Sequence, residues 1–381
     1  MRIGFDIRPF LRQATGVGVY CKNLLFALAE IDDRNDYYLF SSSCRDRFFA
    51  DELPPFSRFK FRDCRYPVKL VNFLWYRLER PTLDSFFRTE LDLTHSPTPL
   101  FLPTRGRKVV TVHDLFFMDY PSLVQKEAKK HFAQRTGNSL HRADGILVVS
   151  QFIKEQIIER FSLDEKKIRV VHHGVSPGFA IKPSIEEKEA VRHTYGLPPA
   201  FLLFVGAIEP RKNLVRLAEA LNLIHQTFSK IPLVIVGKRG RDYGNLIKKI
   251  RELNLGSHVL FLDYLPDKDL KVLYHLASCL VLPSLGEGFG LPLVEAMASG
   301  LPLAVSKAPA LPEVAEDAAL YFHPEKPEDL ACQVVEILTD DTVRESLVKK
   351  GARRVQRFSW KITAEKTLDF YASVLEGRCE G

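Results

Sequence analysis

Short apolar runs alternate with stretches of helical periodicity along the whole chain, and this pattern predicts strands and helices in turn. Clear helical patterns lie at residues 20–30, 215–228 and 267–277. Short apolar strands that alternate with helices indicate parallel sheets covered by helices on both faces. The runs that we expect to form strands are residues 3–6, 37–40, 91–94, 108–112, 145–149, 168–171, 201–205, 232–236, 259–262, 279–282 and 302–305.

A polar, proline-containing stretch at residues 176–199 separates two sets of these runs. The chain has 381 residues, which is more than one ordinary domain and fits two. No fixed-period repeat is present, which argues against a solenoid. We therefore predict an α/β protein of two doubly wound, Rossmann-like domains at residues 1–176 and 177–359, followed by a last helical pattern within residues 360–381.

Composition and targeting signals narrow the class of protein. Apolar residues make up 46% of the chain, which is typical of a globular protein. The first residues enter a strand pattern directly, and no apolar run reaches the roughly 18 residues of a membrane span. None of the six cysteines shows Cys-x-x-Cys spacing, which argues against a zinc or redox site. We expect a reducing, cytoplasmic compartment.

The net positive charge is confined to the first half of the chain. Residues 1–180 hold 28 Lys and Arg against 21 Asp and Glu, whereas residues 181–381 hold 26 of each. Residues 56–80 carry seven basic, two acidic and seven aromatic residues. This segment fits either an anionic membrane surface or an amphipathic helix with a solvated basic face. No motif supports nucleic-acid binding. Candidate membrane contacts are Arg58, Lys60, Arg62, Arg65 and Lys69.

The segment EGFGLPLVE at residues 287–295 carries the strongest chemical signal. An apolar run precedes it and a helical pattern begins at Pro292, so free backbone N–H groups at the helix start suit a phosphate or diphosphate. Gly288 and Gly290 allow the backbone to approach such an anion. Glu287 and Glu295 would repel phosphate, so we interpret them as acceptors for sugar hydroxyls on either side. The alternative is an ordinary strand-to-helix turn with surface glutamates.

A second candidate anion site follows the run at residues 201–205, where the chain reads EPRKN. Arg211 and Lys212 are adjacent cations at a strand end, and together they can neutralise a diphosphate. The alternative is a solvated pair at a helix start, although cations are slightly unfavourable there.

Two further segments follow strands of the first domain. Gly16 and Gly18 open a helical pattern after the first run, but a third spaced glycine is missing, so a dinucleotide fingerprint is poorly supported. His113 and Asp114 end the run KVVTV, at the kind of strand end where catalytic residues gather. They could also form a metal pair or a structural, hydrogen-bonded unit. The adjacent pair His172–His173 is interpreted as structural, because neighbours in a strand point to opposite faces.

The segment EGFGLPLVEAMASGLP closely resembles the signature of group 1 retaining glycosyltransferases, which include bacterial mannosyltransferases and, more distantly, glycogen synthases. The resemblance implies the GT-B fold, with two Rossmann-like domains facing a central cleft and a last helix that returns to the first domain. It places Glu287 by the donor sugar and Glu295 by the ribose, with Gly288, Phe289, Gly290 and Leu291 in the donor loop.

The same resemblance assigns roles elsewhere in the chain. It places Arg211 and Lys212 on the donor diphosphate, His113 against the donor sugar, and Gly16 and Gly18 in a loop facing the phosphates and the acceptor. Many members carry arginine directly after the strand-end glycine, where this chain has Ala207.

The resemblance implies a metal-independent hexosyltransferase without a cofactor, whose co-substrate is a GDP- or UDP-sugar. We expect mannose transfer from GDP-mannose to a glycan or lipid-linked acceptor, in polysaccharide or glycolipid biosynthesis. The first domain would bind the acceptor, in part by peripheral contact with the inner face of the membrane, and the second would bind the donor. Two alternatives are a nucleotide-sugar 2-epimerase of similar architecture and a non-catalytic sugar-nucleotide binding protein.

Overall fold

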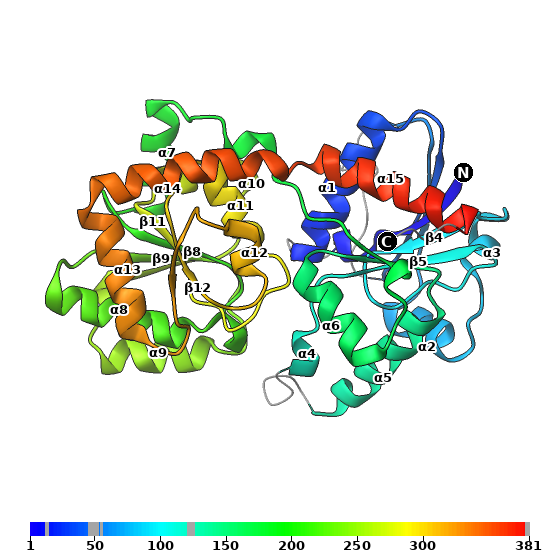
Figure 1. Ribbon diagram of the computed structural model, residues 1–381, viewed down its shortest axis with the longest axis horizontal. Helices are drawn as coiled ribbons and strands as arrows, with labels where there is room; N and C mark the ends of the chain where they lie inside the picture. Colours follow the sequence, from blue (N-terminus) through cyan, green and yellow to red (C-terminus); the bar gives the residue numbers. More distant parts are fainter. Residues whose placement is uncertain (12–14, 45–52, 54–55, 120–125, 378–381) are drawn as a thin grey trace. The chain divides into compact units, whose positions relative to one another are not determined.

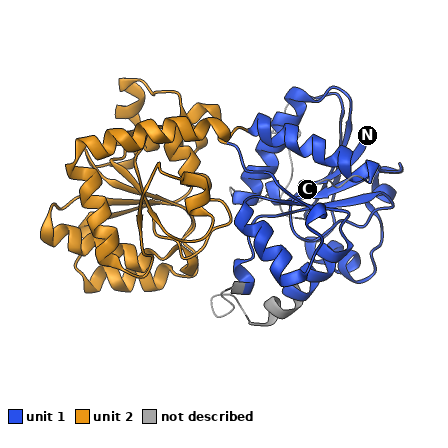
Figure 2. Ribbon diagram, viewed as in Figure 1, with its two compact units in different colours: residues 1–174, 360–381 blue, residues 175–359 orange. Residues whose placement is uncertain are grey.

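The chain forms two compact units, residues 1–174 with 360–381 and residues 175–359, shown in different colours in Figure 2. The computed structural model describes residues 1–11, 15–44, 53, 56–119 and 126–377. The chain therefore passes between the units twice, after residue 174 and after residue 359.

Unit 1 is built on a seven-stranded parallel sheet with the order β3-β2-β1-β4-β5-β6-β7 (Figure 1). In the register of the central strands, Ile3 pairs with both Tyr37 and Leu93. The strand order reverses between β1 and β4, which is the topological switch point of a doubly wound sheet. The strands are β1 (Arg2–Asp6), β2 (Asp36–Ser42), β3 (Phe59–Cys64), β4 (Leu93–Ser96), β5 (Arg107–Val112), β6 (Gly145–Val148) and β7 (Ile168–Val170).

The helices of unit 1 include one from the far end of the chain. Helix α15 packs beside α1, and the two lie side by side in Figure 1. A Cβ atom on Gly145 would lie 2.8 Å from the ring of Phe370, so the absence of a side chain on β6 lets α15 approach the sheet. The helices are η1 (Arg8–Leu11), α1 (Gly16–Ile31), α2 (Val68–Arg77), α3 (Leu83–Phe87), α4 (Phe116–Asp119), α5 (Lys126–Arg142), α6 (Gln151–Phe161), η4 (Glu165–Lys167) and α15 (Trp360–Glu376).

Unit 2 is built on a six-stranded parallel sheet with the order β10-β9-β8-β11-β12-β13. The reversal here lies between β8 and β11, where Cys279 pairs with Leu202. Its four central strands are largely buried, as expected for a parallel sheet with helices on both faces, whereas the two edge strands are only partly buried. The strands are β8 (Leu202–Val205), β9 (Leu233–Val236), β10 (Val259–Leu262), β11 (Cys279–Leu282), β12 (Leu303–Ser306) and β13 (Leu320–Phe322).

The helices of unit 2 begin inside the stretch that separates the two sets of strands. Helix α7 lies there, and a reciprocal cap between Ser184 and Glu187 fixes its start. The helices are η5 (Pro177–Phe179), α7 (Ile185–Tyr195), η6 (Pro210–Lys212), α8 (Leu214–Thr227), α9 (Tyr243–Glu252), η7 (Gly256–His258), α10 (Asp267–Leu276), α11 (Leu291–Ala298), α12 (Leu311–Ala315), α13 (Pro327–Thr339), α14 (Asp341–Arg354) and η8 (Val355–Arg357).

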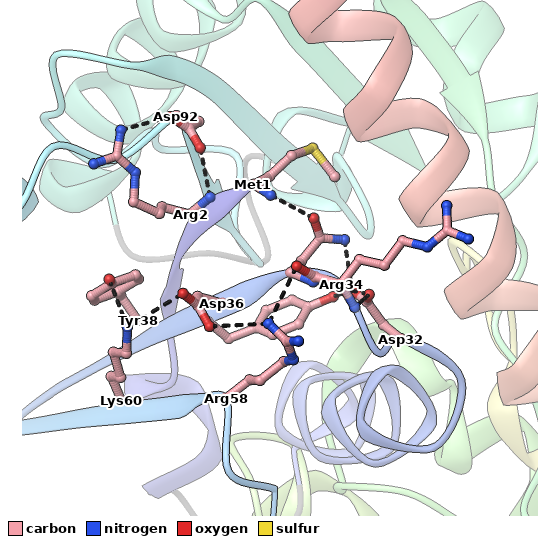
Figure 3. A network of polar contacts seen from close by, with 11 residues as sticks. Met1, Arg2, Asp32, Arg34, Asp36, Tyr38, Arg58, Lys60 and Asp92 are labelled. Carbon is pink, nitrogen blue, oxygen red and sulfur yellow. Dashed lines mark hydrogen bonds and ion pairs between the residues drawn. The ribbon is translucent and has the colours of Figure 1, made fainter.

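The predicted fold class is confirmed, because both sheets are parallel, doubly wound and Rossmann-like. The interpretation of residues 56–80 as one amphipathic helix is wrong, since the segment contains strand β3 and then helix α2. Phe59 and Phe61 alternate with Lys60 and Arg62, which is the period of a strand. Lys60 donates to Asp36 and Tyr38 of the neighbouring strand, as Figure 3 shows. Charged side chains of this kind suit the edge of a sheet.

Among the described residues, the structure contains neither a disulfide nor a helix that could span a membrane. Cys21, Cys44, Cys64, Cys279 and Cys332 are all free thiols, and Cys379 lies outside the described residues. Across the ranges that the structure describes, every helix is too short or too polar to cross a bilayer.

Candidate functional site

The candidate site of unit 2 lies at the carboxyl ends of β8 and β11, on either side of the switch point of the sheet. Helix η6 follows β8 and carries Arg211 and Lys212, whereas residues 283–290 follow β11 and carry Glu287. Ligands of open α/β sheets bind at this position, because the diverging connections leave a crevice at the strand ends. Two segments that are far apart in the sequence are therefore brought together here.

Glu287 is the centre of a buried ion cluster. Its side chain is 7% exposed, and Arg211 Nη1 donates to Oε2 at 2.7 Å. Lys212 Nζ donates to Oε1, which also accepts from Ser284 Oγ at 2.6 Å. Burial opposes ionisation of the carboxyl, but the charges of Arg211 and Lys212 outweigh it and lower the pKa of Glu287 to about 2. Glu287 is therefore a hydrogen-bond acceptor at neutral pH and cannot act as a general acid.

The backbone around the cluster is held by contacts between the two segments. Leu285 N donates to Arg211 O at 2.7 Å, and the Asn213 amide donates to Pro283 O at 3.1 Å and to Pro324 O at 2.7 Å. Asn213 adopts a left-handed conformation with φ of +58°, which asparagine tolerates better than most residues. Ser284 and Asn213 were not singled out from the sequence, although both are polar residues at strand ends.

The loop between the two glutamates is shaped by a glycine and anchored by an aromatic ring. Gly290 has a φ of +92°, and a Cβ atom there would lie 2.8 Å from Leu311. Only glycine fits this position, which directly precedes α11. Phe289 is buried and packs edge-on against Phe358 at 5.6 Å between ring centroids. Its side chain belongs to the core, so only its backbone can meet a ligand.

Glu295 projects from α11 and has a partner of its own, Tyr274 of α10. The Tyr274 hydroxyl donates to Glu295 Oε2 at 2.6 Å. Burial raises the pKa of this carboxyl to about 7, so the protonated and ionised forms are close in free energy at neutral pH. The environments of the two glutamates thus shift their pKa values in opposite directions, down for Glu287 and up for Glu295.

A hollow of unit 2 lies apart from this site. It has a volume of about 1000 Å³ and lies at the amino ends of the strands, where Ala200, Pro232 and Pro302 contribute to its wall. Tyr274 lines it, but neither Glu287 nor Lys212 does. This hollow and the candidate site therefore lie at opposite ends of the strands.

Gly16 and Gly18 lie at the start of α1, after β1 and next to the switch point of the unit 1 sheet. Gly18 N donates to the Thr15 side chain at 3.2 Å, which caps the helix. A Cβ atom on Gly16 would meet no atom within 4 Å, so this position is open. The segment is a capped helix start, and its role with phosphate stays a prediction.

His113 follows β5 and is half-buried in unit 1. Its Nε2 lies 3.1 Å from the Pro97 carbonyl oxygen, and its Nδ1 lies 3.3 Å from His173 Nε2. Burial lowers its pKa to about 4, although the Pro97 carbonyl acts in the opposite direction. Asp114 does not contribute a second catalytic group, because its carboxylate accepts from Phe116 N at the start of α4. The part of the chain described by the structure contains no cluster of three His, Cys, Asp or Glu that could hold a metal.

Two family models match the chain, one mainly in unit 1 and the other in unit 2. The family "Glycosyl transferases group 1" matches residues 186–354, and "Glycosyltransferase Family 4" matches residues 14–179. The O-antigen chain mannosyltransferase B of Escherichia coli is 30% identical over 97% of this chain and 99% of its own length. The O-antigen chain mannosyltransferase RfbU of Salmonella typhimurium is 33% identical over 65% of each chain.

Solved structures of the same architecture include a sucrose-phosphate synthase from Thermosynechococcus elongatus, with a TM-score of 0.77 and 21% identity over 99% of this chain and all of that chain. The Anabaena protein HepE, solved with UDP and glucose, has a TM-score of 0.74 and 19% identity over 98% of this chain and 100% of its own. At these identities the likeness shows the fold alone.

Proposed function

Because this chain belongs to the group 1 glycosyltransferase family, we propose that it transfers mannose from GDP-mannose to a glycan or lipid-linked acceptor, with retention of anomeric configuration. The reaction would serve the biosynthesis of a surface polysaccharide or glycolipid. The observation that carries this proposal is the cluster of Glu287, Arg211 and Lys212 at the switch point of unit 2. It combines a fixed acceptor for sugar hydroxyls with two cations suited to a diphosphate.

The choice of mannose rests on two relatives that are 30% and 33% identical in sequence. Both O-antigen relatives described above are named as mannosyltransferases. The structural neighbour with UDP and glucose is only 19% identical and therefore says little about the sugar used here. GDP-mannose is accordingly the donor to test first, with UDP-sugars as the comparison.

The cations would stabilise the leaving group. A nucleoside diphosphate gains negative charge as the glycosidic bond breaks, and prepositioned positive charges stabilise that transition state more than the ground state. Glu287 holds Arg211 and Lys212 in place and stays ionised, so it would accept hydrogen bonds from the donor sugar. This arrangement supplies the charge that a divalent metal supplies in other transferases. We therefore propose a metal-independent reaction without a cofactor.

In the proposed reaction the acceptor hydroxyl attacks the anomeric carbon on the face from which the diphosphate leaves. The new glycosidic bond forms as the sugar–phosphate bond breaks, and the leaving phosphate oxygen takes the proton of the acceptor hydroxyl. Glu287, with a pKa of about 2, takes no part in this proton transfer. The nucleotide would be held in part by Glu295, whose carboxylate is suited to accept hydrogen bonds from the two ribose hydroxyls.

The acceptor-binding side of unit 1 would include a membrane-binding surface formed by α2. Tyr66, Leu70 and Phe73 are large apolar side chains that are exposed on one face of this segment, and Phe73 is 58% exposed. Val71 and Trp75 point the other way into the core. An exposed apolar stripe is unusual for a helix that packs on its own domain, and it suits the boundary between headgroups and acyl chains.

Basic residues flank this stripe and fit anionic lipids. Arg65, Lys69 and Arg77 are all exposed within or next to α2. Arg58 and Lys60, which the sequence also suggested, pair instead with Asp36, at 3.6 and 3.3 Å (Figure 3). We therefore propose that α2, rather than β3, meets the inner face of the membrane, where a lipid-linked acceptor would be presented.

The proposal is tested by incubating the purified protein with GDP-mannose and membranes from a strain that lacks the gene. Transfer of mannose in an α linkage is the expected result, and the one-bond C1–H1 coupling constant of the product identifies the linkage. A β linkage would contradict retention. Thermal unfolding with GDP, UDP and ADP identifies the base, because a ligand at a hundred times its Kd stabilises by about 2.7 kcal/mol.

A further inference from the structure

The imidazoles of His113 and His173 lie against each other at the carboxyl edge of the unit 1 sheet. Their ring centroids are 5.2 Å apart with an angle of 27° between the planes, and His113 Nδ1 lies 3.3 Å from His173 Nε2. His113 follows β5 and His173 follows β7, so the contact reaches across the end of β6. His173 is 4% exposed.

The partners of His113 determine where its proton lies. Its Nε2 faces the Pro97 carbonyl oxygen at 3.1 Å, and because a carbonyl can only accept, Nε2 carries the hydrogen. Nδ1 of the neutral ring is then an acceptor, so the proton between the two histidines belongs to His173 Nε2. A second proton on His113 could bind only at Nδ1, where it would meet the N–H of His173.

The surroundings of His173 hold it in this position. The ring of Tyr20 packs against both imidazoles, at 4.8 Å from His113 and 5.1 Å from His173 between centroids. The indole of Trp360 lies 5.8 Å from His173. Thr363 of α15 donates to the backbone carbonyl of His172 at 2.9 Å. The segment that carries His173 is therefore fixed from α1 and from α15.

The titratable groups around the pair offer no negative charge that would favour an imidazolium. Among the described residues they are Tyr20 from α1, His95 from β4, His172 beside the pair and Asp114 after β5, whose carboxylate is turned to the backbone of Phe116. His95 and Tyr20 share Thr111 as a hydrogen-bonding partner, at 2.7 and 3.2 Å. Burial lowers the pKa of both His113 and His173.

We propose that His173 is a positioning residue for His113, which it holds in one orientation and as the neutral Nε2–H tautomer by donating a hydrogen bond to Nδ1. This inference rests on the proposed function and on the position against the donor sugar that the family resemblance implies for His113. Glycosyl transfer passes through a transition state with positive charge on the sugar, so an imidazolium next to it would raise the barrier. His173 donates to Nδ1 of His113, which is the atom that would have to take up a proton for His113 to become cationic.

The test compares two substitutions of nearly equal length at one position. His173→Gln keeps an N–H donor near the place of Nε2, whereas His173→Met removes it without shortening the side chain. The C–H resonances of His113 are followed by NMR between pH 5 and 7.5, together with kcat and KM for the donor. His172→Gln, whose side chain lies outside the pair, is the control for a general change in this segment.

In the wild type and in His173→Gln we expect the His113 resonances to stay flat over this range. In His173→Met the pKa of His113 should rise, because a hydrogen bond to the neutral form disfavours the charged form, and its loss removes that restraint. We expect the pKa of His113 to rise by about one unit, from about 4 to about 5. Roughly half of His113 is then charged at pH 5, so kcat should fall about twofold between pH 7.5 and pH 5, with KM changed less.

A flat titration in His173→Met, or a Gln variant that behaves like the Met variant, would overturn the proposal. The NMR titration needs no substrate, so this outcome is distinct from failure of the proposed transferase activity. If His173→Met does not fold, His173→Phe gives the same comparison, because it keeps an aromatic ring against Tyr20 and Trp360 but has no donor.

Discussion

Lys212 and Glu287 form a buried ion pair, although 75 positions separate them in the chain. The pair joins the segment after β8 to the segment after β11 and brings opposite charges together where a diphosphate would add further negative charge. An incoming diphosphate would therefore compete with Glu287 for the same cations. Substitutions at Lys212 and at Glu287 should therefore affect nucleotide binding and turnover differently.

We expect Lys212→Met to reduce turnover more than donor binding. The lost cation stabilises a charge that grows during bond breaking, so kcat should fall by about 10²–10³ while KM for the donor changes by less than tenfold. Lys212→Arg keeps the charge and is the matched control. Steady-state kinetics measure the split, and a chelator should leave the wild-type rate unchanged. Activity that disappears with chelator and returns with Mg²⁺ or Mn²⁺ would contradict the metal-independent reaction.

We expect Glu287→Gln to separate nucleotide affinity from catalysis. The substitution removes a negative charge beside Arg211 and Lys212, so affinity for the free nucleoside diphosphate should stay equal or rise, while kcat falls. Isothermal titration with GDP and an assay with GDP-mannose give the two values. Loss of GDP affinity in this variant would mean that the carboxylate itself contacts the nucleotide.

Stability at low pH should report the same cluster. The folded-state pKa of Glu287, about 2, lies below the ordinary value of 4.5, so its ionisation stabilises the folded state above pH 4.5. That contribution is lost as pH falls from about 4.5 towards about 2. Urea unfolding of wild type and Glu287→Gln across this range should show a smaller pH dependence in the variant. Equal slopes in the two proteins would contradict the lowered pKa.

We expect Glu295→Ala to weaken binding of free GDP by roughly 1.5–3 kcal/mol, the usual contribution of a hydrogen bond to a charged group. The folded-state pKa of Glu295 is about 7, and the ribose hydroxyls would favour its ionised form. GDP affinity should therefore rise with pH through 7 in the wild type. Glu295→Gln corrects for the titration of the phosphate itself, because only the carboxylate component disappears. Parallel pH profiles would show that Glu295 does not bind the ribose.

We expect the exposed face of α2 to control association with anionic vesicles. Phe73→Ser with Leu70→Ser should reduce co-sedimentation at all salt concentrations, since it removes apolar insertion. Substitution of Arg65, Lys69 and Arg77 by Gln should reduce it chiefly at low salt, at about 1 kcal/mol per residue. Lys60→Gln, which removes the contacts of this side chain with Asp36 and Tyr38 on the neighbouring strand, is the control. Equal binding to neutral and anionic vesicles would exclude a contribution of the basic residues, and binding to neither would contradict a membrane-binding surface on α2.

The strands that the sequence pattern predicted are those with continuous apolar runs. β3 and β13 were missed, because β3 alternates charged with apolar residues and β13 has only three residues. The edge position alone is not the reason, since the edge strands β7 and β10 were predicted. In β3 the exposed Lys60 and Arg62 interrupt the apolar run, so the segment looks like a basic helix by composition. Continuous apolar runs reveal strands that are buried on both faces, whereas a strand with one face in water has to be recognised by alternation, as in residues 59–62.

The candidate site was predictable residue by residue, but its contacts were not. Motif residues such as Glu287 and Lys212 stand directly after predicted strands, and this places them at one edge of a sheet. Which strands are neighbours depends on the sheet order, and β8 meets β11 only because the order reverses there. The partnership of Tyr274 with Glu295, and that of His173 with His113, likewise follow from packing between elements that no local pattern connects.

Helix α15 gives the chain an unusual order of assembly. Gly145 leaves a gap in the unit 1 sheet that Phe370 and Val374 fill from the far end of the chain. Domains of a growing polypeptide generally fold from the amino end first. Here the ribosome has delivered every residue of unit 2 before it delivers the helix that completes the core of unit 1. Unit 2 can therefore finish folding first, whereas the core of unit 1 is complete only after α15 has been synthesised.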